Sequence, residues 1–352
     1  MMQGIYFTKE WLYKVKKDFP AVDPTILEKT IYAFELVGSL VNEGLEFIFK
    51  GGTSLLLLLP EPKRLSIDAD IIVNTSQQDL ENKFNRILKK SKFSAWIEDP
   101  RTKSNIPKKH YKFFYSSTIN PQLKSYVLLD VLFQNNPYPK IESKSIEIPY
   151  LKIETDISIN IPSINSILGD KLTAFAPNST GIAFGINKAM EINKQLFDIG
   201  SLFNISDDIE EIKDSFNNFV MLESEYRGKQ FSTNDVIIDI VEISFIISQI
   251  NLKGGFKNKV TDEFLQGMKS LRSHLISGSY NLEDVKINAA KTAFCVSAFN
   301  KKVDYLELKN YGINKIKQSN LTDDLQILER LKNIIPEAYY YWQLVQELRK
   351  FH

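Results

Sequence analysis

The segment from Phe47 to Val73 constrains this chain more than any other, because a turn of glycines and hydroxyl residues precedes a strand that carries two carboxylates. Its sequence is FIFKGGTSLLLLLPEPKRLSIDADIIV. The run from Ile67 onward has the composition of a strand, and residues two apart on a strand point to the same face. Asp68 and Asp70 should therefore project together. Two carboxylates beside such a turn predict a site for Mg²⁺ and a nucleoside triphosphate.

The turn itself supplies groups that suit phosphate. The short strand ends at Lys50, and the next four residues are Gly51, Gly52, Thr53 and Ser54. Glycine lets the backbone approach phosphate oxygens closely and present its N–H groups to them. A helix that starts near Thr53 would add the positive end of its dipole.

A third carboxylate stands in a strongly apolar strand. Residues 125–133 read SYVLLDVLF, in which Asp130 is the single charge. A charge inside a buried strand is costly unless it is paired or bound to a metal. We expect Asp130 to join Asp68 and Asp70 in a two-metal site, where the ions lie roughly 3.5–4 Å apart. The alternative is that Asp130 pairs with a local side chain.

These motifs resemble a known superfamily. GGTSL followed by R-x-S-x-D-x-D, with Arg64 and Ser66, resembles the nucleotidyltransferases with a DNA polymerase β-like core. It is similar in particular to the AbiEii/AbiGii-type toxins of abortive-infection and type IV toxin–antitoxin systems. Two later motifs occur in the family's order, SINSILGDKLTAFA with Lys171 and NKQLFDIGSLF with Asp198. The resemblance covers about residues 30–205.

The resemblance implies a role for each matching residue. The expected metal ligands are Asp68, Asp70 and Asp130, with Mg²⁺ as the ion and Mn²⁺ as an alternative. The expected catalytic residues are Asp68, Asp70, Lys171 and Asp198. The expected nucleotide-binding residues are Lys50, Gly51, Gly52, Thr53, Ser54, Arg64, Ser66 and Lys171. Lys171 would neutralise the triphosphate, and Asp198 would fix Lys171 or the substrate. The second acidic position of the late motif is absent, because Gly200 or Ser201 stands there.

Several of these residues also have an ordinary structural interpretation. A lysine on a helix, such as Lys171, is usually a solvated surface charge. Asp198 could be an exposed position of an amphipathic helix. Arg64 and Ser66 could be turn residues before a strand, and Lys50 could extend its ammonium group to solvent.

The pattern along the chain predicts an α+β protein. Residues 1–160 should form a nucleotidyltransferase-fold core, a mixed sheet with flanking helices. Residues 161–352 should form a mainly helical domain that contributes Lys171 and Asp198 to the site. In the first part, Asp23 and Pro24 mark the start of a helix that ends near Gly44. Further expected elements are a helix over 77–91 and strands near 110–116, 125–133 and 145–155.

The second part reads as helical beyond residue 163. Asn234 and Asp235 should cap a long apolar helix, and another should begin at 281–284. The aromatic run 338–342 should lie in the core, as should Cys295.

Composition excludes several classes of protein. One cysteine and three histidines make a zinc site or a Cys/His nucleophile very improbable. No apolar run reaches the length of a membrane span, so we expect no membrane partner. The first residues, MMQGIYFTKEW, lack the pattern of a signal peptide, and we expect a cytoplasmic protein.

Charge bears on the acceptor substrate. The net charge is +1, yet lysines and arginines cluster over residues 83–112 with Trp96, His110 and Tyr111 among them. Basic residues with interleaved aromatics suit RNA, whereas a solvated helix face and loop is the ordinary alternative.

The combined prediction is a toxin that transfers a nucleoside monophosphate from an NTP to an acceptor hydroxyl, the 3′ end of tRNA. A separately encoded antitoxin would neutralise it. Two alternatives stay open, a nucleotide- or partner-binding module without catalysis, and transfer to a protein or a small molecule.

Overall fold

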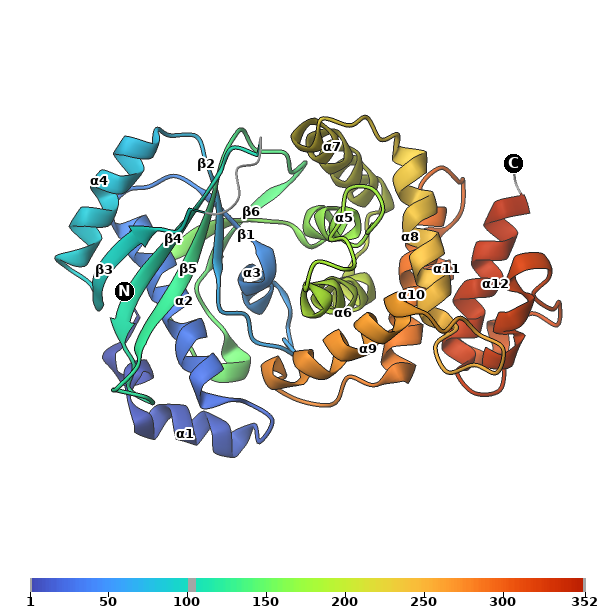
Figure 1. Cartoon of the computed structure of the whole chain (residues 1–352), viewed down its shortest axis with the longest axis horizontal. Helices are drawn as coiled ribbons and strands as arrows, with labels where there is room; N and C mark the ends of the chain where they lie inside the picture. Colours follow the sequence, from blue (N-terminus) through green and yellow to red (C-terminus); the bar gives the residue numbers. More distant parts are fainter. Residues whose placement is uncertain (1, 101–105, 351–352) are drawn as a thin grey trace. The chain divides into compact units, whose positions relative to one another are not determined.

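The chain folds into two compact units (Figure 1). The computed structural model describes residues 2–100 and 106–350. The first unit comprises Met1–Ser163 and Ser273–Ser279, and the second comprises Ile164–Arg272 and Tyr280–His352. The sequence analysis placed the division at residue 160, without the short segment 273–279.

A seven-stranded mixed sheet forms the centre of the first unit. Its strands lie in the order β3-β4-β5-β2-β1-β7-β6. The pairs β2–β5 and β1–β7 are parallel, and the other neighbours are antiparallel. The strands are β1 (Ile48–Lys50), β2 (Ala69–Val73), β3 (Phe93–Glu98), β4 (Lys108–Ser116), β5 (Lys124–Phe133), β6 (Ile141–Ser145) and β7 (Ser158–Pro162).

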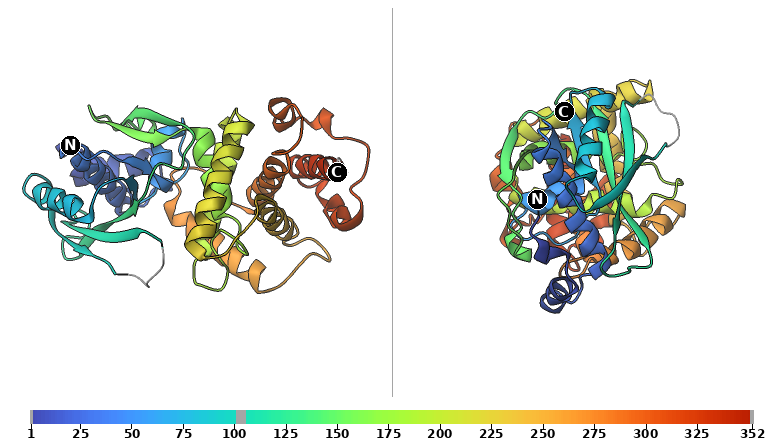
Figure 2. Two further views of the ribbon diagram at one scale, coloured as in Figure 1. Left: turned by 90° about the horizontal axis from the view of Figure 1, so that it is seen from above. Right: turned by 90° about the vertical axis from the view of Figure 1, so that its left-hand side faces the viewer.

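Helices cover one face of this sheet (Figure 2). They are α1 (Lys9–Asp18), α2 (Pro24–Asn42), α3 (Gly51–Leu58) and α4 (Gln77–Leu88). The start of α2 confirms the sequence prediction, because the Asp23 side chain accepts hydrogen bonds from two backbone N–H groups and proline follows it. Helices α2 and α4 present Tyr32 and Phe84 to the aromatic rings of β4.

The side chains along β4 point alternately into the core and to the opposite face of the sheet, which we call the open face. Tyr111, Phe113 and Tyr115 are buried, and they pack against α2 and α4. The intervening residues of β4 point to the opposite face, because side chains alternate along a strand. The predicted carboxylates lie on that opposite face.

The second unit is helical. Its helices are α5 (Ile164–Ala174), α6 (Ala189–Ile205), α7 (Ile209–Arg227), α8 (Thr233–Ser248), α9 (Lys259–Leu271), α10 (Leu282–Ser297), α11 (Tyr305–Lys309) and α12 (Pro336–Lys350). Helix α10 packs against α6, α8 and α12. Trp342 is fully buried and donates a hydrogen bond to Ser248 Oγ at 3.1 Å, and Cys295 is also buried. The predicted α+β class and the aromatic core are confirmed.

Two local predictions were wrong, and one strand was not predicted. Residues 145–155 do not form one strand, because the chain turns through Pro149–Leu151 and Lys152 has a φ of 56°. The edge strand β3 was not predicted. Helix α8 is capped by Ser232, whose side chain and that of Asp235 form a reciprocal capping box.

Among the described residues, no helix has both the length and the apolar character needed to cross a lipid bilayer.

Candidate active site

Four charged or ionisable residues form a row across the sheet. Lys50 on β1 is the register partner of Asp70 on β2, and Asp70 is the partner of Asp130 on β5. Asp130 is in turn the partner of His110 on β4. Register partners on neighbouring strands project to the same face. The sheet therefore brings the predicted carboxylates together, as the spacing in the sequence required.

Asp130 is held by two basic side chains. Lys108 Nζ lies 2.6 Å from one carboxylate oxygen, and His110 Nδ1 lies 2.6 Å from the other. Burial alone would raise the pKa of Asp130, but the hydrogen bond from His110 and the charge of Lys108 outweigh it and lower the pKa. The local pair that the sequence analysis kept as an alternative is therefore present. The metal role of Asp130 stays a prediction.

The pKa of Asp70 is raised, whereas that of Asp130 is lowered. No hydrogen bond or ion pair to the Asp70 carboxylate occurs among residues 2–100 and 106–350. Burial raises the pKa of Asp70 to about 6, and the charges of Asp130 and Asp68 add to this effect. Lys108 and Lys50 act in the other direction. A half-buried carboxylate among other carboxylates is a position that a cation would stabilise.

The two glycines of the turn make room for the site. Gly51 has a φ of 78°, and a Cβ on it would overlap the Asp70 carboxylate. A Cβ on Gly52 would lie 2.7 Å from Arg64 Nη2 and 2.8 Å from Ser66 Oγ. The N-terminus of α3 is thus packed against the side chains of three predicted site residues. This close packing is the physical reason for glycine at both positions.

The hydroxyl residues of the turn bind the backbone around it. Thr53 donates to the carbonyl oxygen of Asp68, and Ser54 donates to that of Gly51 at 2.9 Å. Both side chains are fully buried. These bonds fix the turn to the strand that carries the carboxylates. Contact between either hydroxyl group and phosphate stays a prediction.

A segment distant in the sequence forms backbone hydrogen bonds with the residues around Arg64. Residues 273–279 belong to the first unit, and Leu275 forms an isolated antiparallel bridge with Arg64. Leu65 N–H donates to His274 O at 2.7 Å, and Ile276 N–H donates to Lys63 O at 2.8 Å. The sequence analysis missed this support, because nothing near Arg64 in the sequence signals a partner about 210 residues away.

The late motifs meet in the second unit. Lys171 on α5 forms an ion pair with Asp198 on α6, with Nζ 2.9 Å from Oδ2. Both side chains are buried, so neither is the solvated surface charge considered above. The expected contact between them is present. Their part in a reaction stays a prediction.

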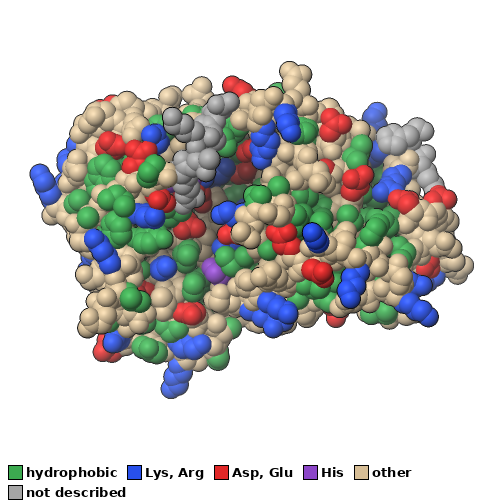
Figure 3. Space-filling view, viewed as in Figure 1, with side chains coloured by type: hydrophobic (Ala, Val, Ile, Leu, Met, Phe, Trp, Pro, Cys, Tyr) green, Lys and Arg blue, Asp and Glu red, His purple; other side chains and the backbone are tan. Residues whose placement is uncertain are grey.

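The structure accounts for much of the basic charge over residues 83–112. Lys109 pairs with Glu98 at 2.6 Å, and Lys112 pairs with Asp99 at 2.8 Å. Tyr111 is a core residue. Arg101 and Lys103 lie outside the described residues. Figure 3 shows basic and acidic side chains interspersed on the viewed face of each unit. This segment therefore gives less support to RNA binding than its composition implied.

The carboxylates of the candidate site suit a cation that also binds the phosphates of the nucleotide substrate. Within the described part of the chain, no three His, Cys, Asp or Glu side chains form a metal-binding group. Mg²⁺ is commonly held by one or two carboxylates together with substrate phosphates. Asp68 and Asp70 would supply such a pair, and no described residue forms a hydrogen bond or ion pair with the Asp70 carboxylate.

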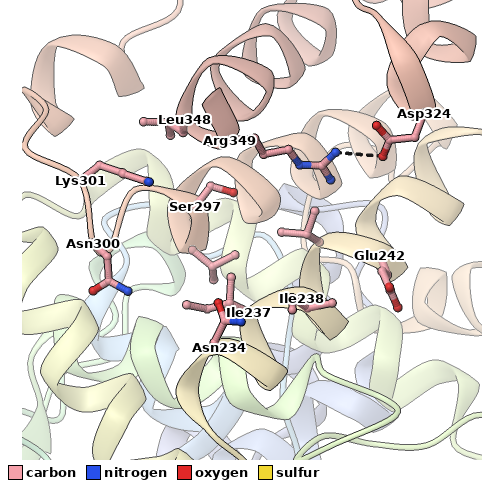
Figure 4. A pocket seen from close by; sticks show the side chains of 12 residues that line it. Asn234, Ile237, Ile238, Glu242, Ser297, Asn300, Lys301, Asp324, Leu348 and Arg349 are labelled. Atoms are coloured by element: carbon pink, nitrogen blue, oxygen red, sulfur yellow. Dashed lines mark hydrogen bonds and ion pairs between the residues drawn. The ribbon is translucent and has the colours of Figure 1, made fainter. Parts of the chain in front are cut away.

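A separate pocket of about 290 Å³ lies in the helical unit, between α8, α10 and α12 (Figure 4). Ile237, Val241 and Leu348 contribute apolar surface to it, and an ion pair of 2.9 Å joins Arg349 and Asp324 at its edge. None of the predicted site residues lines it. The pocket therefore holds none of the predicted chemistry.

Two solved structures illustrate what this chain is similar to. MenT4, a nucleotidyltransferase toxin of Mycobacterium tuberculosis H37Rv, is similar with a TM-score of 0.51 and 10% identity, over 96% of this chain and 99% of that one. JHP933 of Helicobacter pylori is similar with a TM-score of 0.46 and 17% identity, over 81% of this chain and 96% of that one. No curated protein sequence matches the chain.

A family model identifies the chain more directly. The model described as nucleotidyl transferase AbiEii toxin, type IV toxin–antitoxin system, matches residues 36–269. This range includes the glycine turn, the carboxylate strands and both late motifs. The chain belongs to the AbiEii family of nucleotidyltransferase toxins.

Proposed function

We propose that this toxin transfers a nucleoside monophosphate from an NTP to a hydroxyl group of the tRNA 3′ end, with Mg²⁺ held by Asp68 and Asp70. The observation that carries the proposal is the Asp70 carboxylate, which is half-buried, packed against the glycine turn, and without a hydrogen bond to any residue that the structure describes. A side chain kept in that state is typical of functional sites.

In this proposal, each of the residues around Asp70 has its own task. Because Gly51 and Gly52 have no side chains, phosphate oxygens can come close to the backbone N–H groups at the start of α3. Arg64 and Ser66 lie beside Gly52, where the guanidinium group can contact the same phosphates. The bound Mg²⁺ would neutralise phosphate charge and orient the reacting oxygens. The acceptor oxygen forms a bond to the α-phosphorus, and pyrophosphate and a proton are released.

Lys171 and Asp198 have a defined place in this proposal. Lys171 neutralises the triphosphate, and Asp198 holds the ammonium group through the 2.9 Å ion pair. An ion pair with a buried partner restricts the orientation of the ammonium group, which suits contact with phosphate. Lys50, the register partner of Asp70, adds a positive charge at the carboxylate row.

Family membership implies an antitoxin partner. The tRNA acceptor, the identity of the antitoxin and a cytoplasmic location stay predictions. The competing acceptors are a protein side chain and a small molecule. A binding module without catalysis would not require Asp70 to stay unpaired.

The test is incubation of the protein with each α-labelled NTP, Mg²⁺ and a cell extract that contains RNA and protein. We expect label in tRNA, and none with Asp68→Ala or Asp70→Ala. Asp156→Ala, which alters an exposed carboxylate of the same unit, is the matched control and should label normally. Label in protein or in small molecules would refute the tRNA acceptor, and equal labelling by Asp70→Ala would refute the site.

A further inference from the structure

The open face of the sheet continues beyond the carboxylate row. His110 and Asp130 are register partners, and the next pairs that point to the same face are Lys112 with Leu128 and Phe114 with Tyr126. Lys124 follows at the far end of β5. We call Phe114, Tyr126, Lys124 and the adjacent Lys29 of α2 the aromatic-lysine face.

This face is accessible and positively charged. Tyr126 is 41% exposed, and its part of β5 is paired with β4 alone among the named strands of the described residues. The Phe114 and Tyr126 rings lie 5.9 Å apart, edge to face. Lys124 Nζ lies 4.5 Å from the centre of the Phe114 ring, and Lys29 Nζ lies 5.9 Å from that of Tyr126. Figure 3 shows apolar side chains flanked by lysines over the region of β3 to β5.

The two lysines are the charges available for a ligand. Lys112 also lies near the Tyr126 ring, but it pairs with Asp99. For Lys29 and Lys124, the contacts with the aromatic rings are the interactions found in the described part of the chain. An exposed cation–π contact is weak, so an arriving phosphate can draw the ammonium group away and uncover the ring.

The face is also at a useful distance from the carboxylates. Tyr126 and Asp130 are four residues apart on β5, which corresponds to about 13 Å along the strand. A few nucleotides of single-stranded RNA span that distance. An RNA strand whose 3′-terminal hydroxyl group lies at the carboxylate row would thus pass over the rings of Tyr126 and Phe114.

We propose that the aromatic-lysine face binds the single-stranded 3′ end of the RNA acceptor, with bases stacked on Tyr126 and Phe114 and phosphates on Lys29 and Lys124. This inference rests on the proposed function. Stacking on aromatic rings beside basic side chains is the usual mode of binding unpaired RNA, and it needs no particular base. A protein partner would not require lysines at both rings.

The test measures RNA binding without turnover. In an Asp70→Ala background, 5′-labelled RNA hairpins with and without a short single-stranded 3′ tail are titrated by fluorescence anisotropy. Tyr126→Ala should weaken binding of the tailed RNA about tenfold and leave the blunt RNA unchanged. Tyr126→Phe should bind like the parent, because it keeps the ring. Tyr13→Ala, another exposed tyrosine of the same unit, is the matched control.

The lysines give an independent measurement. Lys29→Gln and Lys124→Gln should each reduce the slope of log affinity against log salt by about 0.7. NTP affinity should be unchanged in these variants. Equal binding of tailed and blunt RNA by the parent, or no loss in Tyr126→Ala, would overturn the inference. Neither result would affect the proposed function, which the labelling experiment decides separately.

Discussion

Asp70 and Asp130 are direct partners on neighbouring parallel strands, yet their carboxyl groups are perturbed in opposite directions. The pKa of Asp70 is raised to about 6 by burial and by its acidic neighbours. The pKa of Asp130 is lowered, because the bonds from His110 and Lys108 outweigh its burial. The sheet therefore places a carboxylate with two basic partners beside one for which the described part of the chain shows no hydrogen bond or ion pair.

This difference predicts opposite effects of the same substitution on stability. The native state binds the Asp70 proton more tightly than the unfolded state does, so that stabilising contribution is present below pH 4 and is lost as the pH rises through about 6. Asp70→Asn should thus raise the free energy of unfolding of the metal-free protein at pH 8, by about 1–3 kcal/mol. It should also abolish transfer. Chemical denaturation in the presence of a chelator measures the first effect.

Asp130→Asn is the matched comparison. Its lowered pKa stabilises the native state above the unfolded-state pKa, and this contribution is lost as the pH falls through the folded pKa. Removing the charge leaves Lys108 and His110 without their shared acceptor and should cost about 1–3 kcal/mol at pH 8. Stabilisation by Asp130→Asn, or destabilisation by Asp70→Asn, would contradict this account of the row.

The raised pKa of Asp70 also predicts how cation binding depends on pH. A cation that binds Asp70 must displace its proton below about pH 6. Affinity for Mn²⁺, a paramagnetic substitute for Mg²⁺, should therefore rise between pH 5 and pH 6 and level off above about pH 7. Electron paramagnetic resonance of free Mn²⁺ gives the affinity directly. Asp70→Asn should bind weakly at every pH, and a flat profile for the parent would argue against Asp70 as a ligand.

Sequence patterns predicted those features that depend on near neighbours. The turn at Gly51 and Gly52, the electrostatic effect of Asp68 on Asp70, and the cap at Asp23 each follow from a spacing of a few residues. The predicted fold class also follows from such patterns. These features depend on residues close together in the sequence, so contacts between distant segments have little influence on them.

Features that depend on register between distant segments could not be predicted in this way. The pairs Lys109–Glu98 and Lys112–Asp99 form across β3 and β4, and a strand missing from the prediction cannot supply partners. Composition alone therefore overestimated the charge available for RNA. The bridge from Leu275 to Arg64 joins segments far apart in the sequence and has no local signal.

The Lys171–Asp198 pair offers a test that separates catalysis from folding. Lys171→Met removes the ion-pair partner of the buried Asp198 carboxylate and should cost about 3–5 kcal/mol. Adding Asp198→Asn removes that charge and should restore most of the stability. Transfer should stay lost in both variants, because the phosphate-facing charge is absent. Recovery of transfer together with stability in the double variant would show that the pair serves only the fold.

Gly51→Ala gives the last test, because the effect of backbone strain can be measured separately from the effect of the contact with Asp70. Both Gly51 and Gly44 have a positive φ, 78° and 67°, so alanine at either position should cost about 1 kcal/mol in backbone strain. A Cβ on Gly44 meets nothing within 4 Å, whereas one on Gly51 overlaps the Asp70 carboxylate. Gly51→Ala should therefore also weaken Mn²⁺ binding and abolish transfer, while Gly44→Ala should keep both. If Gly51→Ala bound Mn²⁺ and transferred nucleotide as well as Gly44→Ala, the packing of Asp70 against the turn would have no part in the site.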